Sequence, residues 1–256
     1  MCGRIALYSP PDRLARQFDA GLAPDLGEAA EPHWNVPPTQ GVLAMVHPRH
    51  KGAESKEGAR DVSDASGHDR EPHRLIASFR WGLVPWWAKD LSIGNKQFNA
   101  RAETLERRPA FRSALAERRC LVLADGFYEW KKEVVADKAR KTPYFFTRSD
   151  GEPLAFAGLW ETWRDPAQPR ELRTKIRTCT IITTSSGPDI KGVHDRMPVV
   201  VDREHFDEWL EPSQLDPTEL SAILRPAPAG TLSSIEVTSR VNSVRNEGPE
   251  LLERAN

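Results

Sequence analysis

The sequence predicts a single α+β domain with a mixed, mostly antiparallel β-sheet core and a few peripheral helices. Its 256 residues, of which 39% are hydrophobic, are enough for one large domain with a packed core. Short runs rich in branched and aromatic residues recur along the chain, as expected for strands. Because helices and strands do not alternate regularly, a doubly wound parallel sheet is not expected. We expect the domain to extend over residues 2–256.

Strands are expected at residues 4–8, 41–47, 75–81, 119–124, 143–147, 154–160, 177–184 and 198–201. A first helix should start after Ser9, with Pro10 or Pro11 in its first turn, where proline is tolerated. Two later helices should begin at Asp202 and Asp216, which can cap the free amides of a first turn. The residues expected to face the core or end these helices are Leu14, Ala15, Phe18, Trp209, Leu210 and Leu224.

Residues 48–74 interrupt this pattern. They contain six basic and six acidic residues, almost nothing to bury, and lie between two expected strands. We expect a mobile loop that joins two strands of one sheet, not a linker between domains. His50, His68 and His73 fall inside the loop and His47 borders it, but no helix or strand fixes their spacing. A solvated loop is therefore favoured over a metal site.

The charge is balanced overall but unevenly distributed. With 36 basic and 37 acidic residues, the formal charge is −1, so a polyanionic partner must meet a local basic patch. Residues 101–119 carry six arginines and three glutamates, whereas residues 202–219 carry seven acids and one arginine. This asymmetry can give a neutral protein an anion-binding face, although solvated helix faces look the same.

Several features point to the cytoplasm as the expected compartment. No apolar run approaches the roughly 20 residues of a membrane span, and the N-terminus lacks the hydrophobic segment of a signal peptide. Cys2, Cys120 and Cys179 are an odd number without metal-site spacing, so neither a disulfide framework nor a zinc site is indicated. No metal or other cofactor is expected.

The chain begins Met1-Cys2-Gly3-Arg4, and methionine is usually removed when the second residue is small. Removal would leave Cys2 with a free α-amine and a thiol on adjacent carbons. Both are partly nucleophilic near neutral pH, because their unperturbed pKa values are about 7.7–8.0 and about 8.5. A 1,2-aminothiol condenses with an aldehyde to an imine, which the sulfur closes to a five-membered thiazolidine. The alternative is an ordinary buried cysteine at the start of a strand.

Three other segments combine groups suited to acid–base chemistry. Asn99 opens a run that also holds an arginine and a glutamate. Glu129 follows an apolar strand and stands among three aromatic residues, where a carboxyl group can act as a general acid. His194 stands beside an acid and an arginine, just before a strand. Each segment also has a simpler interpretation: a turn, a hairpin glutamate paired with lysine, and a helix cap.

Together with Met-Cys-Gly-Arg, these motifs resemble the SOS-response-associated peptidase (SRAP) family, whose members process abasic sites in single-stranded DNA. The resemblance runs from Cys2 to near the C-terminus, where residues 238–242 and 246–251 also match. Two departures are modest. Ile5 stands where the family often has phenylalanine, and residues 48–74 form a longer and more polar segment than usual.

The resemblance implies a covalent crosslink between the abasic site and N-terminal Cys2. Glu129 matches the family's acid–base glutamate, which would help to open the sugar to its aldehyde. His194 matches the histidine that would donate to the ring oxygen or polarise the intermediate. Asn99 matches the asparagine that would orient the Cys2 amine or hold the sugar. Ring closure would shield the strand from cleavage, and weak abasic-site lyase activity would accompany an open imine.

The resemblance also implies a surface for single-stranded DNA, made of Arg4, Asn35, Pro38, Trp86, Trp87, Arg101, Arg108, Arg112 and Arg196. The arginines would contact phosphates, although the match slips by one residue near Pro109 and so supports Arg108 and Arg112 less. The two tryptophans would stack on bases or wedge between them, with Pro38 as the companion wedge; tryptophan pairs are also typical of a core. Asn35 would contact the DNA backbone or cap a turn. We expect the protein to act as a monomer.

Two other functions remain open. An N-terminal-nucleophile amidohydrolase, such as a class II glutamine amidotransferase, also exposes Cys-Gly and uses the thiol against an amide. That function leaves Glu129 and the His194 motif unexplained. A non-catalytic single-strand binder would bind intact and abasic strands equally and never crosslink. Peptidase activity that removes Met1, which the family name suggests, would complement the crosslinking function.

Overall fold

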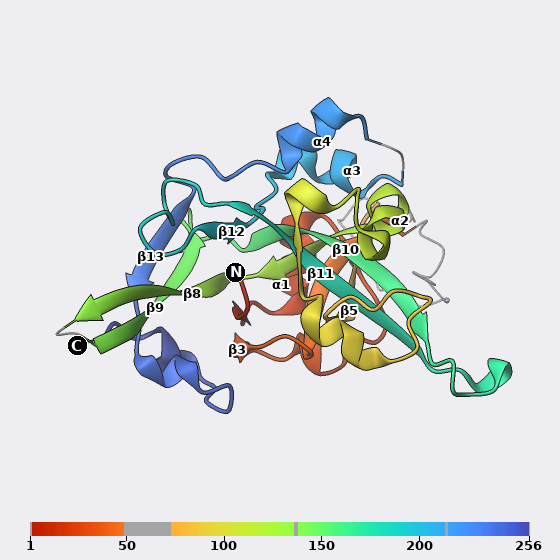
Figure 1. Cartoon of the computed structure of the whole chain (residues 1–256), viewed down its shortest axis with the longest axis horizontal. Helices are drawn as coiled ribbons and strands as arrows, with labels where there is room; N and C mark the ends of the chain where they lie inside the picture. The colour runs from red at the N-terminus through yellow and green to blue at the C-terminus, as the bar shows by residue number, and fades with distance from the viewer. Residues whose placement is uncertain (1, 49–72, 136–137, 213–214, 256) are drawn as a thin grey trace.

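The structure, a computed structural model, describes residues 2–48, 73–135, 138–212 and 215–255. It confirms the predicted α+β class, because the strands build two packed sheets and short helices lie at the periphery (Figure 1). The sequence predicts neither the division into two sheets nor the closure of one of them.

The first sheet has five antiparallel strands, in the order β13 (Leu232–Glu236), β9 (Lys138–Arg148), β8 (Gly126–Val135), β1 (Ile5–Leu7) and β3 (His33–Val36). β8 and β9 form a long hairpin, which extends to the left in Figure 1 with β13 alongside. The short strand β1 is inserted between β8 and β3, so both of its edges are paired. This insertion holds the N-terminal residues in the middle of the molecule.

The second sheet has eight strands: β12 (Arg196–Pro198), β11 (Lys175–Ser185), β10 (Leu154–Arg164), β7 (Arg119–Ala124), β4 (Gly41–Val46), β5 (Leu75–Trp81) and β2 (Gly21–Leu22), with β6 (Asn99–Arg101) beside β11. β5 also pairs with β11, so the sheet closes on itself through β11, β10, β7, β4 and β5. The pairs β5–β11, β6–β11 and β2–β5 are parallel, and the others are antiparallel. The sheet is therefore mixed and mostly antiparallel, as predicted.

The two sheets meet at Asp125, the one residue between β7 and β8. Its carboxylate accepts hydrogen bonds from the backbone amides of Tyr8 and Ser9, at 2.6 and 2.7 Å, and from the Ser9 hydroxyl at 2.6 Å. Its own amide donates to the carbonyl of Ala6 at 2.8 Å. Because a buried carboxylate needs such partners, Asp125 ties the end of β1 to the junction of the sheets.

The closed part of the second sheet, made of β11, β10, β7, β4 and β5, forms a ring. Alternate residues of its strands pack into two different hydrophobic clusters. In β4, Val42 and Ala44 join the cluster that also contains Trp81, whereas Leu43 and Met45 join the other. Both faces of β4 are buried, which explains why its sequence is continuously apolar and does not alternate with polar residues.

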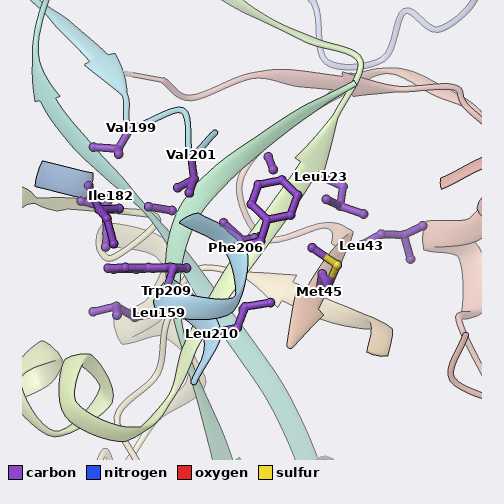
Figure 2. Close-up of a cluster of buried hydrophobic side chains, with 14 of the residues drawn as sticks. Leu43, Met45, Leu123, Leu159, Ile182, Val199, Val201, Phe206, Trp209 and Leu210 are labelled. Carbon is purple, nitrogen blue, oxygen red and sulfur yellow. The ribbon is translucent and has the colours of Figure 1, made fainter. Parts of the chain in front are cut away.

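The helices cover one face of the ring. Figure 2 shows Phe206, Trp209 and Leu210 of α3 (Phe206–Leu210) among apolar side chains of the ring strands. The same cluster takes residues from α1 (Pro11–Phe18), α2 (Pro109–Glu117) and α4 (Pro217–Ile223). Short 3-10 helices connect the elements: η1 (Gly27–Ala30), η2 (Leu91–Lys96), η3 (Ala102–Thr104), η4 (Arg170–Leu172), η5 (Arg203–His205), η6 (Ser239–Asn242) and η7 (Pro249–Leu252).

Most predicted elements are confirmed, with local corrections. The expected start of α1 and the capping of α4 by Asp216 are correct, and the Asp216 carboxylate accepts from two first-turn amides. The helix expected at Asp202 instead begins with the 3-10 helix η5. The Asp202 carboxylate makes no cap hydrogen bond and lies 3.7 Å from Arg148 Nη1. The strand expected at 198–201 is displaced, since β12 ends at Pro198. Elements not predicted are β2, β3, β6, β13, α2 and most of β8.

The strands on either side of residues 48–74, β4 and β5, pair as antiparallel neighbours in one sheet, as predicted. Residues 49–72, including His50 and His68, lie outside the described residues. The prediction of a mobile loop there stays a prediction.

Replacing Gly126 by alanine should destabilise the junction at which β8 begins. A Cβ at this position would lie 2.6 Å from the carbonyl oxygen of Phe146 and would also collide with the Phe145 ring. We expect the free energy of unfolding to fall by about 1–3 kcal/mol, measured by urea denaturation. Gly192→Ala is the matched control, because a Cβ there meets nothing within 4 Å. Equal stability of the two variants would contradict the packing argument.

Candidate active site

Cys2 lies three residues before β1, and its side chain is fully buried in the apolar cluster that contains Ile5, Val36 and Trp81. Burial raises the pKa of the Cys2 thiol far above its usual range, and the nearby negative charge of Glu129 raises it further. The thiol therefore keeps its proton at neutral pH. A base must remove that proton when the sulfur reacts.

Asn99 reaches Cys2 from another strand. It lies in β6, which pairs in parallel with β11 at Ile181, and its Nδ2 donates to the Cys2 carbonyl oxygen at 2.5 Å. The Asn99 Oδ1 atom is buried and has no hydrogen-bond partner among the described residues. It is thus an acceptor held beside the N-terminal residue.

Glu129 faces His194. Glu129 lies in β8 with 3% of its surface exposed, and its Oε2 atom is 3.8 Å from Nε2 of His194. The simpler interpretation of a glutamate paired with a hairpin lysine fits Glu133 instead, whose carboxylate lies 3.4 Å from Lys131. A buried carboxylate beside an imidazole is an arrangement typical of proton transfer.

His194 has contacts for both protonation states of its Nδ1 atom. The backbone N–H of Arg196 donates toward Nδ1 at 3.0 Å, which suits the bare nitrogen. The carbonyl oxygen of Arg196 lies at 3.2 Å and the Asp195 carboxylate at 3.1 Å, which suit the protonated nitrogen. The imidazole can therefore gain or lose a proton at Nε2, on the side of Glu129, without losing its partners at Nδ1.

Arg196 is fixed by Glu103. The guanidinium donates to both Glu103 carboxylate oxygens, at 2.5 and 3.1 Å, and to the carbonyl of Thr183 at 2.6 Å. The hydrogen bond from Arg196 lowers the pKa of Glu103, which keeps the carboxylate charged. A DNA phosphate could bind Arg196 bidentately only by replacing Glu103.

The acid–base pair opens into a pocket of about 360 Å³. Its lining is Glu129, Trp130, Lys132, Lys141, His194 and Asn242. The indole N–H of Trp130 donates to Asn242 Oδ1 at 2.7 Å, so the C-terminal segment closes one side of the pocket. Its volume lies within the roughly 300–1,000 Å³ range of small-ligand sites.

Arg4 is anchored beside Trp130, which lines this pocket. Its Nη1 donates to Asn35 Oδ1 at 2.6 Å and to the Val241 carbonyl at 2.9 Å. The guanidinium carbon lies 5.7 Å from the centre of the Trp130 ring, within cation–π distance. The contact of Arg4 with a DNA phosphate stays a prediction, and these partners would hold the cation in place for it.

The position of the Asn35 side chain differs from the one expected for contact with the DNA backbone or for capping a turn. The side chain is fully buried, and its Nδ2 donates to the carbonyls of Ser243 and Asn246, each at 2.9 Å. Because both ends of the amide are used inside the protein, the side chain does not reach a DNA strand or cap a turn. It connects β3 and Arg4 to the C-terminal segment. The motifs of that segment match the family but indicate no function by themselves.

Trp86 and Trp87 lie on the surface, with 66% and 50% exposed. Their neighbours Val84 and Ala88 are buried, so the loop is anchored while both rings face outward. The alternative that this pair belongs to the core is wrong. Pro38 is partly exposed. Stacking of these three residues on DNA bases stays a prediction.

The other predicted cations lie outside this pocket. Arg101 is exposed at the end of β6, and Arg108 and Arg112 are exposed at the start of α2. Their DNA contacts stay predictions. Arg119, from the same arginine-rich run, is buried and donates to the carbonyl of Leu115 at 2.7 Å, so part of that run has a structural role.

Comparison with known proteins identifies the family. The chain matches the family described as SOS response associated peptidase (SRAP) over residues 1–244. The chain belongs to this family. Two Bacillus subtilis SRAP relatives, the abasic site processing proteins YoqW and YoaM, are 38% and 39% identical over 253 and 256 residues, covering at least 99% of each chain. A solved protein from Bacteroides thetaiotaomicron is 21% identical with a TM-score of 0.78 over 100% of both chains, which shows a shared fold.

Sequence reasoning missed several residues of this SRAP site. Glu103 fixes Arg196, and Trp130, Lys132, Lys141 and Asn242 line the pocket. Glu103 is the glutamate of the run that opens with Asn99, but its partner Arg196 is 93 residues away in the sequence. The two lysines stand nine residues apart in an ordinary charged strand pattern, which carries no signal of its own.

Within the described ranges, no helix is long and apolar enough to cross a membrane. In the same parts of the chain, no three His, Cys, Asp or Glu side chains are grouped so that they could hold a metal ion. Of the histidines near the 48–74 segment, His47 lies 3.4 Å from the Glu211 carboxylate.

Stability of this SRAP protein should fall at alkaline pH because of its buried thiols. Burial raises the pKa values of Cys2, Cys120 and Cys179 in the folded state, so the folded protein holds these protons more tightly than the unfolded chain. The resulting stabilisation is complete below the usual thiol pKa of about 8.5–9 and is lost as pH rises above it.

We expect the free energy of unfolding to decrease by up to about 1.4 kcal/mol per pH unit for each thiol above that value. Urea denaturation between pH 7 and 10 measures the effect. Cys179→Ala removes one buried thiol and should show a shallower pH dependence than the parent protein. An identical dependence would exclude this thiol as a contributor.

Proposed function

We propose that this protein recognises abasic sites in single-stranded DNA and crosslinks to them through Cys2 after Met1 is removed. One observation carries the proposal: three separate segments meet at the buried Cys2, since Asn99 donates to its carbonyl, Glu129 lies near its thiol, and His194 faces Glu129. The names of the Bacillus subtilis relatives support the same substrate.

The reaction joins both nucleophiles of Cys2 to one carbon. The α-amine adds to the C1′ aldehyde of the opened sugar, and loss of one water gives an imine. The thiol sulfur then adds to the imine carbon while the thiol proton passes to the nitrogen. The products are a thiazolidine, which holds C1′ as an sp3 carbon, and one water molecule.

Each nearby side chain has a task in this sequence. An abasic sugar is mostly a closed hemiacetal, so Glu129 would move the proton that exposes the aldehyde. His194 would protonate the ring oxygen or the departing water through Nε2, since its Nδ1 has partners in either state. The buried Oδ1 of Asn99 would accept a hydrogen bond from the Cys2 amine and aim its lone pair.

Ring closure would also protect the strand. An open imine at C1′ acidifies C2′ and promotes elimination of the 3′ phosphate, which breaks DNA. Sulfur addition removes the imine, so weak lyase activity would come only from the fraction that has not closed. Peptidase activity of the same site toward Met1 would expose the amine.

The surface around the site supports binding of a single strand. Arg4 is held next to the pocket, and the exposed rings of Trp86 and Trp87 offer stacking faces. Arg101 is exposed near Glu103 and Arg196, where it could meet a phosphate. Phosphate contacts of this kind would make binding weaken as salt increases.

Blocking the α-amine of Cys2 should abolish the heat-stable crosslink. Thiazolidine formation consumes the nitrogen and the sulfur of one residue, and a peptide nitrogen cannot replace an amine. We expect protein with an uncleavable N-terminal tag to bind DNA but to give no crosslink with an abasic strand on denaturing electrophoresis. Cys120→Ala and Cys179→Ala should crosslink like the parent protein.

Mass spectrometry of the digested adduct gives the decisive result. A sugar on any peptide that does not begin at Cys2, or normal crosslinking by the tagged protein, would show the mechanism to be wrong. Glutaminase turnover without DNA would favour the amidohydrolase alternative instead.

Glu129→Gln should slow crosslinking and leave affinity for intact single strands nearly unchanged. The substitution keeps size and hydrogen bonding but removes the titratable group, and general acid–base catalysis typically contributes about 10²–10⁴-fold. The measurement is the rate of adduct formation with an abasic oligonucleotide, together with binding to the same sequence without the lesion. Equal rates for variant and parent would transfer the proton-moving role to another group.

A further inference from the structure

Two lysines of the β8–β9 hairpin lie in an unfavourable arrangement. Lys132 on β8 and Lys141 on β9 are directly opposite each other in the antiparallel register. Like charges in this position destabilise a sheet. A negative charge bound by both lysines would relieve this repulsion.

The other cations of this hairpin have acidic partners. Lys131 lies 3.4 Å from Glu133, and Arg140 lies 3.6 Å from Glu236. Among the residues that the structure describes, no carboxylate forms an ion pair with Lys132 or Lys141. The two opposed lysines are therefore a local excess of positive charge with no ion-pair partner in the part of the chain that the structure describes.

This excess charge lies in the candidate active site. Both lysines line the same 360 Å³ pocket as Glu129 and His194. Trp130, which also lines the pocket, carries the Arg4 guanidinium over its ring. Arg4, Lys132 and Lys141 are therefore three cations in or next to the pocket that holds the acid–base pair.

We propose that Lys132 and Lys141 together bind one phosphate of the DNA strand, the one adjacent to the abasic sugar. This inference rests on the proposed function and names the site that holds the substrate's backbone. A sugar held at Cys2 carries a phosphate on each side, and both must lie close to Glu129 and His194. A phosphodiester held by both lysines would supply a counter-charge for this pair.

Salt dependence of binding tests this site. The probe is a fluorescent single-stranded oligonucleotide of mixed sequence with no lesion, so that affinity is measured without a crosslink. Loss of one phosphate contact lowers the slope of log affinity against log salt by about 0.7. Because the two lysines share one phosphate, the double variant Lys132→Gln/Lys141→Gln should lose about 0.7 in total.

The control is Lys138→Gln, an exposed lysine of β9 that does not line the pocket, and its slope should equal that of the parent. A double variant with an unchanged slope would overturn the site. A loss of about 1.4, the value for two separate phosphates, would overturn the shared contact.

The variant Lys132→Glu tests DNA binding and folding stability separately. A glutamate opposite Lys141 converts the repulsive pair into an attractive one, so the melting temperature should equal or exceed that of the parent. DNA affinity should nevertheless fall, because the phosphate would meet a carboxylate. A lower melting temperature with unchanged DNA binding would contradict both parts of the argument.

Measurements on the parent protein show whether the lysine site alone is wrong or the proposed function is wrong as well. If it crosslinks an abasic oligonucleotide while the lysine variants keep its salt slope, the lysine site is wrong and the proposed function stands. If the parent neither binds single strands nor crosslinks, the proposed function and the lysine site are both wrong.

Discussion

The pairing of β1 on both edges is the constraint on which the site depends. Chain termini usually fray, so chemistry at an N-terminal residue requires that the terminus be held. β1 has three residues and cannot hold itself, but β8 and β3 flank it and Asp125 binds the amides that follow it. Cys2 is buried because the strand after it is fixed in the middle of a sheet.

Burial of Cys2 determines the proton chemistry around it. The apolar surroundings keep the thiol neutral, and the Glu129 carboxylate adds to that effect. A neutral thiol is a weak nucleophile, so the same environment that orders the residue also creates the need for a base. Under the proposed function, Glu129 and His194 supply the acid–base groups beside this thiol, and the imidazole has hydrogen-bond partners in either protonation state.

The cations of the site are held in three different ways. Arg4 is bound by neutral oxygens of Asn35 and Val241, with the negative charge of Glu247 nearby. Arg196 is neutralised by a bidentate contact with Glu103. Lys132 and Lys141 face each other. An incoming phosphate could therefore bind Arg4 without displacing its partners. It would compete with Glu103 for Arg196, and it would reduce the repulsion between Lys132 and Lys141.

The sequence by itself determined the α+β class and most ring strands, because short apolar runs and capping residues act locally. It also gave the prediction that Cys2, Glu129 and His194 are catalytic, because the short runs that contain them together resemble one family, although each run alone has a simpler interpretation. The closure of the ring, the burial of Asn35 and the partnership of Glu103 with Arg196 were decided only by the tertiary structure. The reason is physical: these features depend on contacts between segments far apart in the chain, and no local pattern records which distant partner a polar side chain will meet.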